Sequence, residues 1–243
     1  MDELTAQNPS SIREMFGVIS KRYDLANTVL SWGIHRRWKK RLVRESGVKE
    51  NDWVLDCATG TGDLAFLFEA ALRGTGQVIG SDFCEPMLEV ASQKAKRSGS
   101  STRFEQADVM NLPYPDSQFN IASISFGIRN VKEPQKALDQ LGRVVKPGGQ
   151  VLILEFGQPH SRLMAALFSF YSNWLLPWIG GWISGQRQAY RYLQTSSAAF
   201  PCRDQFLEIA KRTGRFSKMR TISFQGGIAY LYILQVSSLN KLT

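Results

Sequence analysis

The feature that most constrains the fold is a strand-to-turn sequence at residues 54–63, Val-Leu-Asp-Cys-Ala-Thr-Gly-Thr-Gly-Asp. An apolar run leads into a turn of small residues with two glycines, Gly60 and Gly62, and helix-like residues 64–68 follow at once. Glycine lets a ligand approach the backbone because it has no Cβ, and the start of the helix presents unpaired N–H groups beside it. The stretch therefore predicts a strand, a nucleotide-type turn and a helix.

Acidic residues beside this turn narrow the choice of ligand. A dinucleotide-binding turn of the form G-x-G-x-x-G has a third glycine, whereas position 65 here is alanine. Asp56 and Asp63 stand on either side of the turn, and two carboxylates would repel a pyrophosphate. They suit a ligand with a positive end, such as the sulfonium and α-amino groups of S-adenosylmethionine (SAM). The turn therefore predicts a SAM site.

Two further strand ends carry acids at the expected spacing. Asp82 ends the second apolar run, twenty residues after Gly62, where a carboxylate can accept both ribose hydroxyls. Asp108 follows the third run and is a candidate to hold the adenine amine. A glycine pair alone occurs in tight turns of any fold, but three acidic strand ends point to a ligand site. The predicted cofactor-binding residues are Asp56, Gly60, Thr61, Gly62, Asp82, Phe83, Asp108, Val109 and Ser125.

Strand-like and helix-like segments alternate from residue 53 onward. Strands are expected near 53–57, 77–81, 102–107, 119–125 and 149–155, with helices near 63–73, 85–98 and 133–145. This alternation predicts an α/β fold with a doubly wound, mostly parallel sheet of seven strands. The last two strands, 219–224 and 228–236, form a hairpin that closes the sheet with an antiparallel strand. We expect one domain over 1–243, with an N-terminal cap of two helices in 1–50 and a helical lid insert at 158–200.

Composition bounds the partners and the compartment. The net charge of +9 favours anionic partners, either nucleic acid or lipid head groups. The three cysteines, Cys57, Cys84 and Cys202, are odd in number and lack ligand-like spacing, which predicts a reducing compartment without disulfides or a metal site. The first residues lack a basic and apolar signal segment, so the expected location is the cytoplasm.

Three longer motifs resemble a known family. Residues 23–38 resemble Y-D-x-M-N-x-x-x-S-x-x-x-H-x-x-W, residues 125–131 resemble F-G-[LI]-R-N-V, and residues 143–157 resemble R-V-L-K-P-G-G followed by E-F-S. Together they resemble class I SAM-dependent methyltransferases, and more narrowly the ubiquinone/menaquinone biosynthesis C-methyltransferases. The sequence departs from the pattern at Ala26, Thr59, Gly157, Gln186, 195–197 and 230–232. These departures leave the cofactor unaffected and put the exact acceptor in doubt.

The resemblance implies methyl transfer from SAM to a ring carbon of a prenylated hydroquinone. It assigns Arg129 as the electrostatic partner of an acceptor phenolate, with Asn130 orienting it. Tyr23 is a candidate to bind an acceptor oxygen or to cap the cofactor. The alternatives are a structural salt bridge for Arg129 and simple packing for Tyr23. No general base is assigned, and His35 is expected to be a hydrogen-bonded or helix-ending residue.

The insert and the basic runs suggest a membrane surface. Residues 163–182 carry no charge and are long enough to span a bilayer, but Pro177 and the pair Gly180-Gly181 favour an amphipathic lid. Trp174, Trp178 and Trp182 recur at four-residue spacing, which suits an interface between an oily and a wet side. The basic run 36–44 and a cluster within 203–220 predict peripheral contact with an anionic membrane, unless these charges line solvated helix faces. A homodimer stays open.

Two other functions stay open. One is SAM-dependent methylation of another apolar acceptor, such as a phenolic metabolite, a sterol or a polyketide. The other is a scaffold that binds SAM or quinone without turnover, although loss of Asp56, Gly60, Gly62 or Asp82 would be its signature and all four are present. Nucleic acid is not expected as a substrate, since residues 125–128 lack the N-P-P-Y type of turn.

Overall fold

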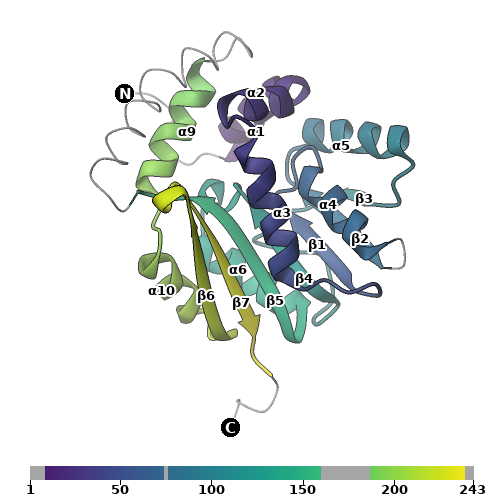
Figure 1. The fold of residues 1–243 in the computed structure, drawn as a ribbon, viewed down its shortest axis with the longest axis vertical. Helices are drawn as coiled ribbons and strands as arrows, with labels where there is room; N and C mark the ends of the chain where they lie inside the picture. Colours follow the sequence, from purple (N-terminus) through teal and green to yellow (C-terminus); the bar gives the residue numbers. More distant parts are fainter. Residues whose placement is uncertain (1–8, 74–75, 160–186, 239–243) are drawn as a thin grey trace.

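A seven-stranded sheet forms the centre of the molecule (Figure 1). The computed structural model describes residues 9–73, 76–159 and 187–238. The strands are β1 (Trp53–Cys57), β2 (Gln77–Asp82), β3 (Arg103–Gln106), β4 (Phe119–Ser125), β5 (Val145–Phe156), β6 (Phe216–Phe224) and β7 (Ala229–Val236). Their order is β3-β2-β1-β4-β5-β7-β6, and β7 runs antiparallel to both neighbours. The predicted doubly wound sheet with a closing antiparallel hairpin is confirmed.

Helices cover both faces of the sheet because its central strands are apolar on both sides. On one face, α3 (Ile34–Ser46) and α4 (Asp63–Leu72) contribute Trp38, Leu42 and Phe68 to a buried cluster with β1, β2 and β5. On the other face, α6 (Pro134–Val144) and α10 (Asp204–Arg212) contribute Leu138 and Phe206 to a second cluster. Two further helices after residue 50 are α5 (Glu85–Ser98) and α9 (Arg187–Ala199), and short 3₁₀ turns are η3 (Ile128–Asn130) and η5 (Gln225–Gly227).

The N-terminal region contains three helices where two were expected. These are α1 (Pro9–Ile19), α2 (Tyr23–Leu30) after the 3₁₀ turn η2 (Ser20–Arg22), and α3. The extra break occurs because Trp32 and Gly33 adopt positive φ angles of 51° and 71°, which interrupt the helix before α3 begins. Only α1 and α2 form a cap. They pack on α5 through Ile19, Ala26 and Met87, whereas α3 lies on the sheet.

Strand β5 begins earlier than expected. Pairing with β4 starts at Val145, shifts register before Gln150, and leaves residues 146–149 as a bulge in which Gly148 has a φ of 79°. The Pro-Gly-Gly sequence therefore marks a bulge within the strand and not its start.

Part of the predicted lid lies outside the described residues. This applies to the apolar run 163–182 with its three tryptophans, and to Gln186. Within the described ranges, no helix combines the length and the apolar character needed to cross a membrane.

Candidate functional site

A cavity opens where the parallel strands end. Its empty volume, including the solvent at its mouth, is about 980 Å³. Six of the nine residues predicted to bind the cofactor line it: Gly60, Asp82, Phe83, Asp108, Val109 and Ser125. The cap contributes Phe16 and Tyr23, so the cavity lies between the sheet edge and the N-terminal helices. The expectation that strand ends converge on one ligand site agrees with this geometry.

Asp82 is held at the floor of this cavity by the backbone. Its Oδ2 accepts a hydrogen bond from Gly60 N–H at 2.8 Å, and its Oδ1 accepts one from Cys84 N–H at 2.9 Å. Burial raises the pKa of this carboxyl, while the same N–H groups oppose the shift. The N–H of Phe83 also acts on this carboxyl, so at least one of its roughly four lone-pair sites remains for a ribose hydroxyl.

The two glycines of the turn serve different purposes. A Cβ on Gly60 would meet no atom within 4 Å and would occupy open space beside the cavity. A Cβ on Gly62 would lie 2.7 Å from the ring of Phe104. Gly60 therefore leaves room for a ligand, whereas Gly62 does not line the cavity and leaves room for packing.

Asp56, which the sequence analysis predicted to face the cofactor, is buried and does not line the cavity. Its side chain is only 1% exposed, and its oxygens accept hydrogen bonds from Thr59 Oγ1 and Ser123 Oγ, each at 2.7 Å. Burial raises its pKa to about 6, against the two hydroxyls. Asp56 does not line the cavity because its carboxylate turns into the protein between β1 and β4.

Asp63, the second acid beside the turn, also has protein partners. Its carboxylate lies 2.6 Å from Lys94 Nζ and 3.9 Å from Lys39 Nζ. The anionic groups that face the cavity are therefore Asp82 and Asp108.

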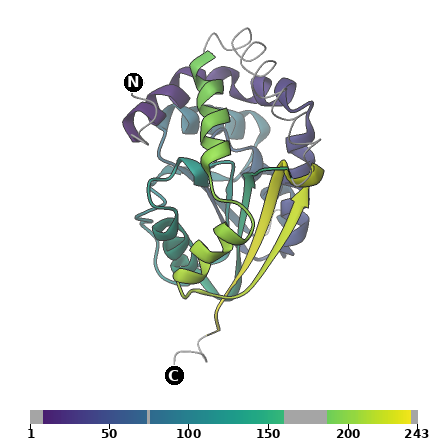
Figure 2. The same cartoon turned by 90° about the vertical axis from the view of Figure 1, so that its left-hand side faces the viewer.

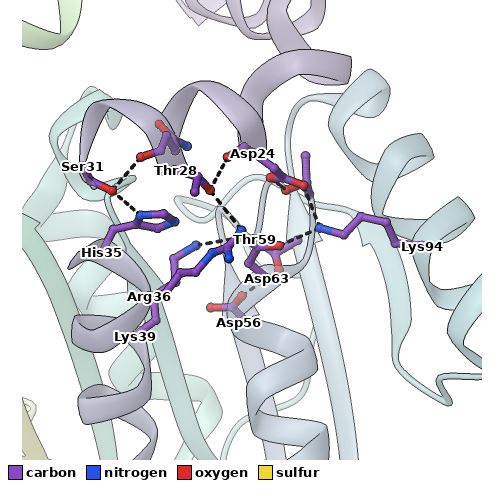
Figure 3. A network of polar contacts seen from close by, with 12 residues as sticks. Asp24, Thr28, Ser31, His35, Arg36, Lys39, Asp56, Thr59, Asp63 and Lys94 are labelled. Carbon is purple, nitrogen blue, oxygen red and sulfur yellow. Dashed lines mark hydrogen bonds and ion pairs between the residues drawn. The ribbon is translucent and has the colours of Figure 1, made fainter. Parts of the chain in front are cut away.

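A polar network ties the cap to the glycine turn (Figure 3). Lys94 on α5 donates to Asp24 on α2 at 2.9 Å and to Asp63 on α4 at 2.6 Å. Thr61 completes the network by donating from Oγ1 to Asp24 Oδ1 at 2.5 Å. Thr61 thus holds α2 on the turn and does not line the cavity. Sequence reasoning missed Asp24 and Lys94, because an acid and a lysine 70 positions apart carry no local signal.

His35 belongs to the structural part of this region. Ser31 Oγ donates to the carbonyl of Asn27 at 2.6 Å and lies 2.5 Å from His35 Nδ1. Since the single hydroxyl proton goes to the carbonyl, Nδ1–H donates to Ser31. Burial lowers the pKa of His35 to about 4, so the ring is neutral near pH 7. This agrees with the expectation of a hydrogen-bonded histidine.

Tyr23 of α2 and Asn130 of η3 both line the cavity. Asn130 Oδ1 accepts a hydrogen bond from Tyr192 OH of α9 at 3.1 Å. Burial raises the pKa of Tyr23, opposed by a hydrogen bond from Asn27 and by the positive charge of Arg129. Tyr23 is thus a neutral hydrogen-bonding group at neutral pH. Tyr192 was not predicted.

Arg129 lies behind the cavity wall. It is 5% exposed, its Nη1 lies 2.7 Å from Glu155 Oε1, and the same nitrogen donates to Phe126 O at 2.6 Å. Among the described residues, Glu155 and the Phe126 carbonyl hold the Arg129 side chain, and Asn130 pairs with Tyr192 instead. Arg129 Nε has no hydrogen-bond partner among the described residues. The alternative of a buried salt bridge is therefore present, although the charge also acts on the hydroxyls of Tyr23 and Tyr192.

The donor set fits the cofactor that the sequence predicts. Asp82 has lone pairs to spare, and Gly60 leaves open space at the turn. Ser125 Oγ is buried in the cavity wall and has no hydrogen-bond partner among the residues described. These groups suit a nucleoside with vicinal hydroxyls, and Gly60, Asp82 and Ser125 would hold it.

The departures from the family pattern turn away from the cavity wherever the structure describes them. The hydroxyls of residues 195–197 bond back to carbonyls of their own helix, α9. Tyr230 and Tyr232 are 1% exposed, and their hydroxyls meet Arg203 at 2.9 and 2.7 Å. Thr59 holds Asp56. These substitutions therefore supply no reason for a changed acceptor.

Comparisons with known proteins agree on one family. Residues 4–234 match the model of the ubiE/COQ5 methyltransferase family. The chain is 55% identical over 225 residues to the ubiquinone/menaquinone biosynthesis C-methyltransferase UbiE of Bdellovibrio bacteriovorus, covering 93% of this chain and 95% of that one. It is 39% identical over 219 residues to the demethylmenaquinone methyltransferase of Thermus thermophilus, covering 90% of this chain and 98% of the relative.

Solved structures agree on the fold. A SAM-dependent methyltransferase from Aquifex aeolicus aligns with a TM-score of 0.58 and 18% identity, covering 82% of this chain and 89% of that chain. Phosphoethanolamine N-methyltransferase 2 of Haemonchus contortus, solved with SAM, aligns with a TM-score of 0.60 and 18% identity, covering 83% of this chain and 52% of that chain. At these identities the likeness concerns the fold alone.

Proposed function

This chain belongs to the ubiE/COQ5 methyltransferase family, and we propose that it methylates a ring carbon of a prenylated quinol in quinone biosynthesis, with SAM as the methyl donor. The observation that carries the proposal is the 55% identity to a quinone C-methyltransferase over 93% of the chain. The cavity at the strand ends, with Asp82 and Gly60 in its wall, supports it.

In this proposal some of the residues that line the cavity bind SAM and others bind the acceptor. In this proposal Asp82 accepts hydrogen bonds from the ribose hydroxyls, and Asp108 with Val109 holds the adenine. Gly60 lets the ligand approach the turn, and Ser125 offers its unpartnered hydroxyl. Tyr23 and Asn130 lie at the same cavity and hold the oxygens of the acceptor.

The chemistry requires an electron-rich ring carbon next to an electrophilic methyl group, which SAM supplies when bound. The carbon becomes nucleophilic when the neighbouring hydroxyl ionises, so the protein must favour the phenolate. Arg129 provides a fixed positive charge behind Tyr23 and Asn130, and Glu155 keeps its position. Holding the two reactants in line supplies much of the rate, since effective molarities reach about 10⁵ M or more.

Contact with an anionic membrane is part of the proposal because a quinol with a prenyl tail resides in the bilayer. The basic cluster near the C-terminus is a poor candidate for that contact. Lys211 pairs with Glu208, Arg215 with Asp139 and Arg220 with Glu45. In the basic run 36–44, Arg36, Arg37, Lys40 and Arg44 are exposed. We also propose a homodimer, without a role in the reaction, which sedimentation equilibrium would test.

The test is a methyl-transfer assay with labelled SAM and reduced demethylmenaquinol or ubiquinone-precursor analogues in detergent. We expect label in the quinol, lost in Asp82→Ala together with SAM affinity, and lost in Arg129→Ala with SAM affinity retained. Glu208→Ala, on an exposed ion pair far from the cavity, is the matched control. Tight SAM binding without label in any quinol would refute the proposal and direct the search to other phenolic, sterol or polyketide acceptors.

A further inference from the structure

Helix α2 has an apolar stripe on the side that faces away from the protein. Its inward residues Ala26 and Leu30 are buried. Leu25 and Val29 are 59% and 42% exposed, and Trp32, in the turn that follows, is 86% exposed. The four-residue spacing places Leu25 and Val29 along one line of α2, and Trp32 follows in the turn after the helix. Large apolar side chains in such a line are unusual on a surface that faces only water.

Positive charge surrounds this stripe. Arg22 precedes Leu25 by three residues just before α2, and Arg36 of α3 stays exposed while it donates to Thr28 Oγ1 of α2. Arg37 and Lys40 are also exposed on α3. Residues 20–44 contain eight lysines and arginines and one acid.

The single acid does not cancel this charge. Asp24 turns inward, where it pairs with Lys94 and accepts from Thr61. The stripe and its border therefore present apolar and cationic groups together, with the acid directed to the opposite side of α2.

We propose that this surface, formed by Leu25, Val29 and Trp32, enters the interface of an anionic bilayer. An exposed tryptophan suits the level of the head groups, and flanking cations attract anionic lipids. The inference rests on the proposed function in one respect, because a lipid-borne acceptor gives the docking a purpose.

The position of the stripe is consistent with that purpose. Helices α1 and α2 lie at the end of the molecule opposite the last residues of β7, as Figure 2 shows. The same helices wall the cavity through Phe16 and Tyr23 on their inner sides. A bilayer against the outer side would bring a prenylated ring within one helix thickness of the site.

The experiment measures binding to vesicles of neutral phosphatidylcholine, with and without anionic phosphatidylglycerol, by flotation. We expect wild type to bind anionic vesicles in a salt-dependent manner. The double variant Leu25→Gln/Trp32→Asn removes the apolar contact and should bind at least about tenfold more weakly than wild type. Glutamine suits the helix at position 25, and asparagine tolerates the positive φ at position 32. Arg37→Gln/Lys40→Gln should also bind about tenfold more weakly.

The matched control is Arg212→Gln/Lys218→Gln, which removes the same charge from two exposed positions elsewhere and should bind as wild type does. Unchanged binding of the stripe variant, equal weakening by the control, or indifference to lipid charge would overturn the proposal. The proposal would also be overturned if wild type were a dimer without lipid and the stripe variant a monomer, because the stripe would then contact a second copy.

A second readout separates this inference from the proposed function. The stripe variant should methylate a short-tailed, detergent-soluble quinol at the wild-type rate and a vesicle-embedded quinol at least several-fold more slowly. Stripe-dependent vesicle binding without methylation of any quinol would refute the proposed substrate and leave the docking surface standing. Equal rates of wild type and the stripe variant on the vesicle-embedded quinol would overturn the role of the stripe.

Discussion

Replacing Glu155 by glutamine would leave the Arg129 guanidinium in the core without its counter-charge. The two side chains are 1% and 5% exposed and lie 2.7 Å apart. Breaking a buried pair from one side costs about 3–5 kcal/mol, because the remaining charge is desolvated and unpaired. Glutamine keeps the volume and one acceptor oxygen, so we expect a loss near 3 kcal/mol. For a chain of this length that corresponds to a fall in Tm of roughly 6–12 °C.

The assay is urea unfolding of Glu155→Gln, Arg129→Met and the double variant Arg129→Met/Glu155→Leu. Removing both charges replaces the pair by apolar groups, which is often neutral. The double variant should therefore recover most of the stability, with a coupling free energy of about 2 kcal/mol or more. A loss below about 1 kcal/mol in Glu155→Gln would refute the reasoning, because the pair would then be hydrated in solution.

The same variants separate structure from catalysis at Arg129. If its charge favours the acceptor phenolate, the folded double variant binds SAM normally and has a strongly reduced kcat. Glu155→Gln keeps the guanidinium and should retain more activity than the double variant at a temperature where both are folded. A double variant with wild-type kcat would show that Arg129 acts only as a buried structural charge.

Three further predictions follow from individual contacts. Lys94→Met leaves Asp24 and Asp63 without their shared cation; since these side chains are 28–34% exposed, we expect about 1 kcal/mol of destabilisation and a few-fold weaker SAM binding in calorimetry, with no effect of the exposed Lys96→Met as control. The pKa of Asp56 near 6, above its unfolded value of 3.8, means that the folded state retains a proton while the unfolded state releases it. This group therefore lowers stability as pH rises from about 4 to 6, by about 3 kcal/mol in total, and Asp56→Asn should remove that slope from urea midpoints; an unchanged slope would contradict the assignment. Gly127→Ala would place a Cβ 2.5 Å from Ala58 Cβ and should cost about 1–3 kcal/mol, which Ala58→Gly should partly restore if the clash is the cause.

Much of the fold could be predicted from the chain because the relevant signals are local. The strand, the glycine turn and the following helix lie within some twenty consecutive residues, and their periodicity reports burial directly. Asp82 and Asp108 could be placed at one site because parallel strands end at one edge of a sheet. Gly60 could be predicted beside this cavity because a backbone that a ligand approaches closely has no room for a Cβ.

The structure differs from the predictions where single residues changed the backbone path and where packing set the direction of a side chain. The turn at Trp32 and Gly33 divided a continuous helical pattern into two helices. Gly62 was assigned to the ligand, but the ring of Phe104 occupies the space that its Cβ would need. Local periodicity does not reveal the contact between Gly62 and Phe104, because Phe104 lies on another strand, β3.

The order of the elements, the strand ends that line the cavity and the family can be read from the chain alone. Which charges face the cavity depends on how the elements pack in three dimensions. Asp56 turns inward to Ser123, Asp63 to Lys94, and Arg129 to Glu155. Each partner lies 26 or more positions away along the chain, and a buried charge pairs with whatever group the packed elements bring within about 3 Å. The direction of a side chain is therefore set by packing, which local patterns of polarity do not contain.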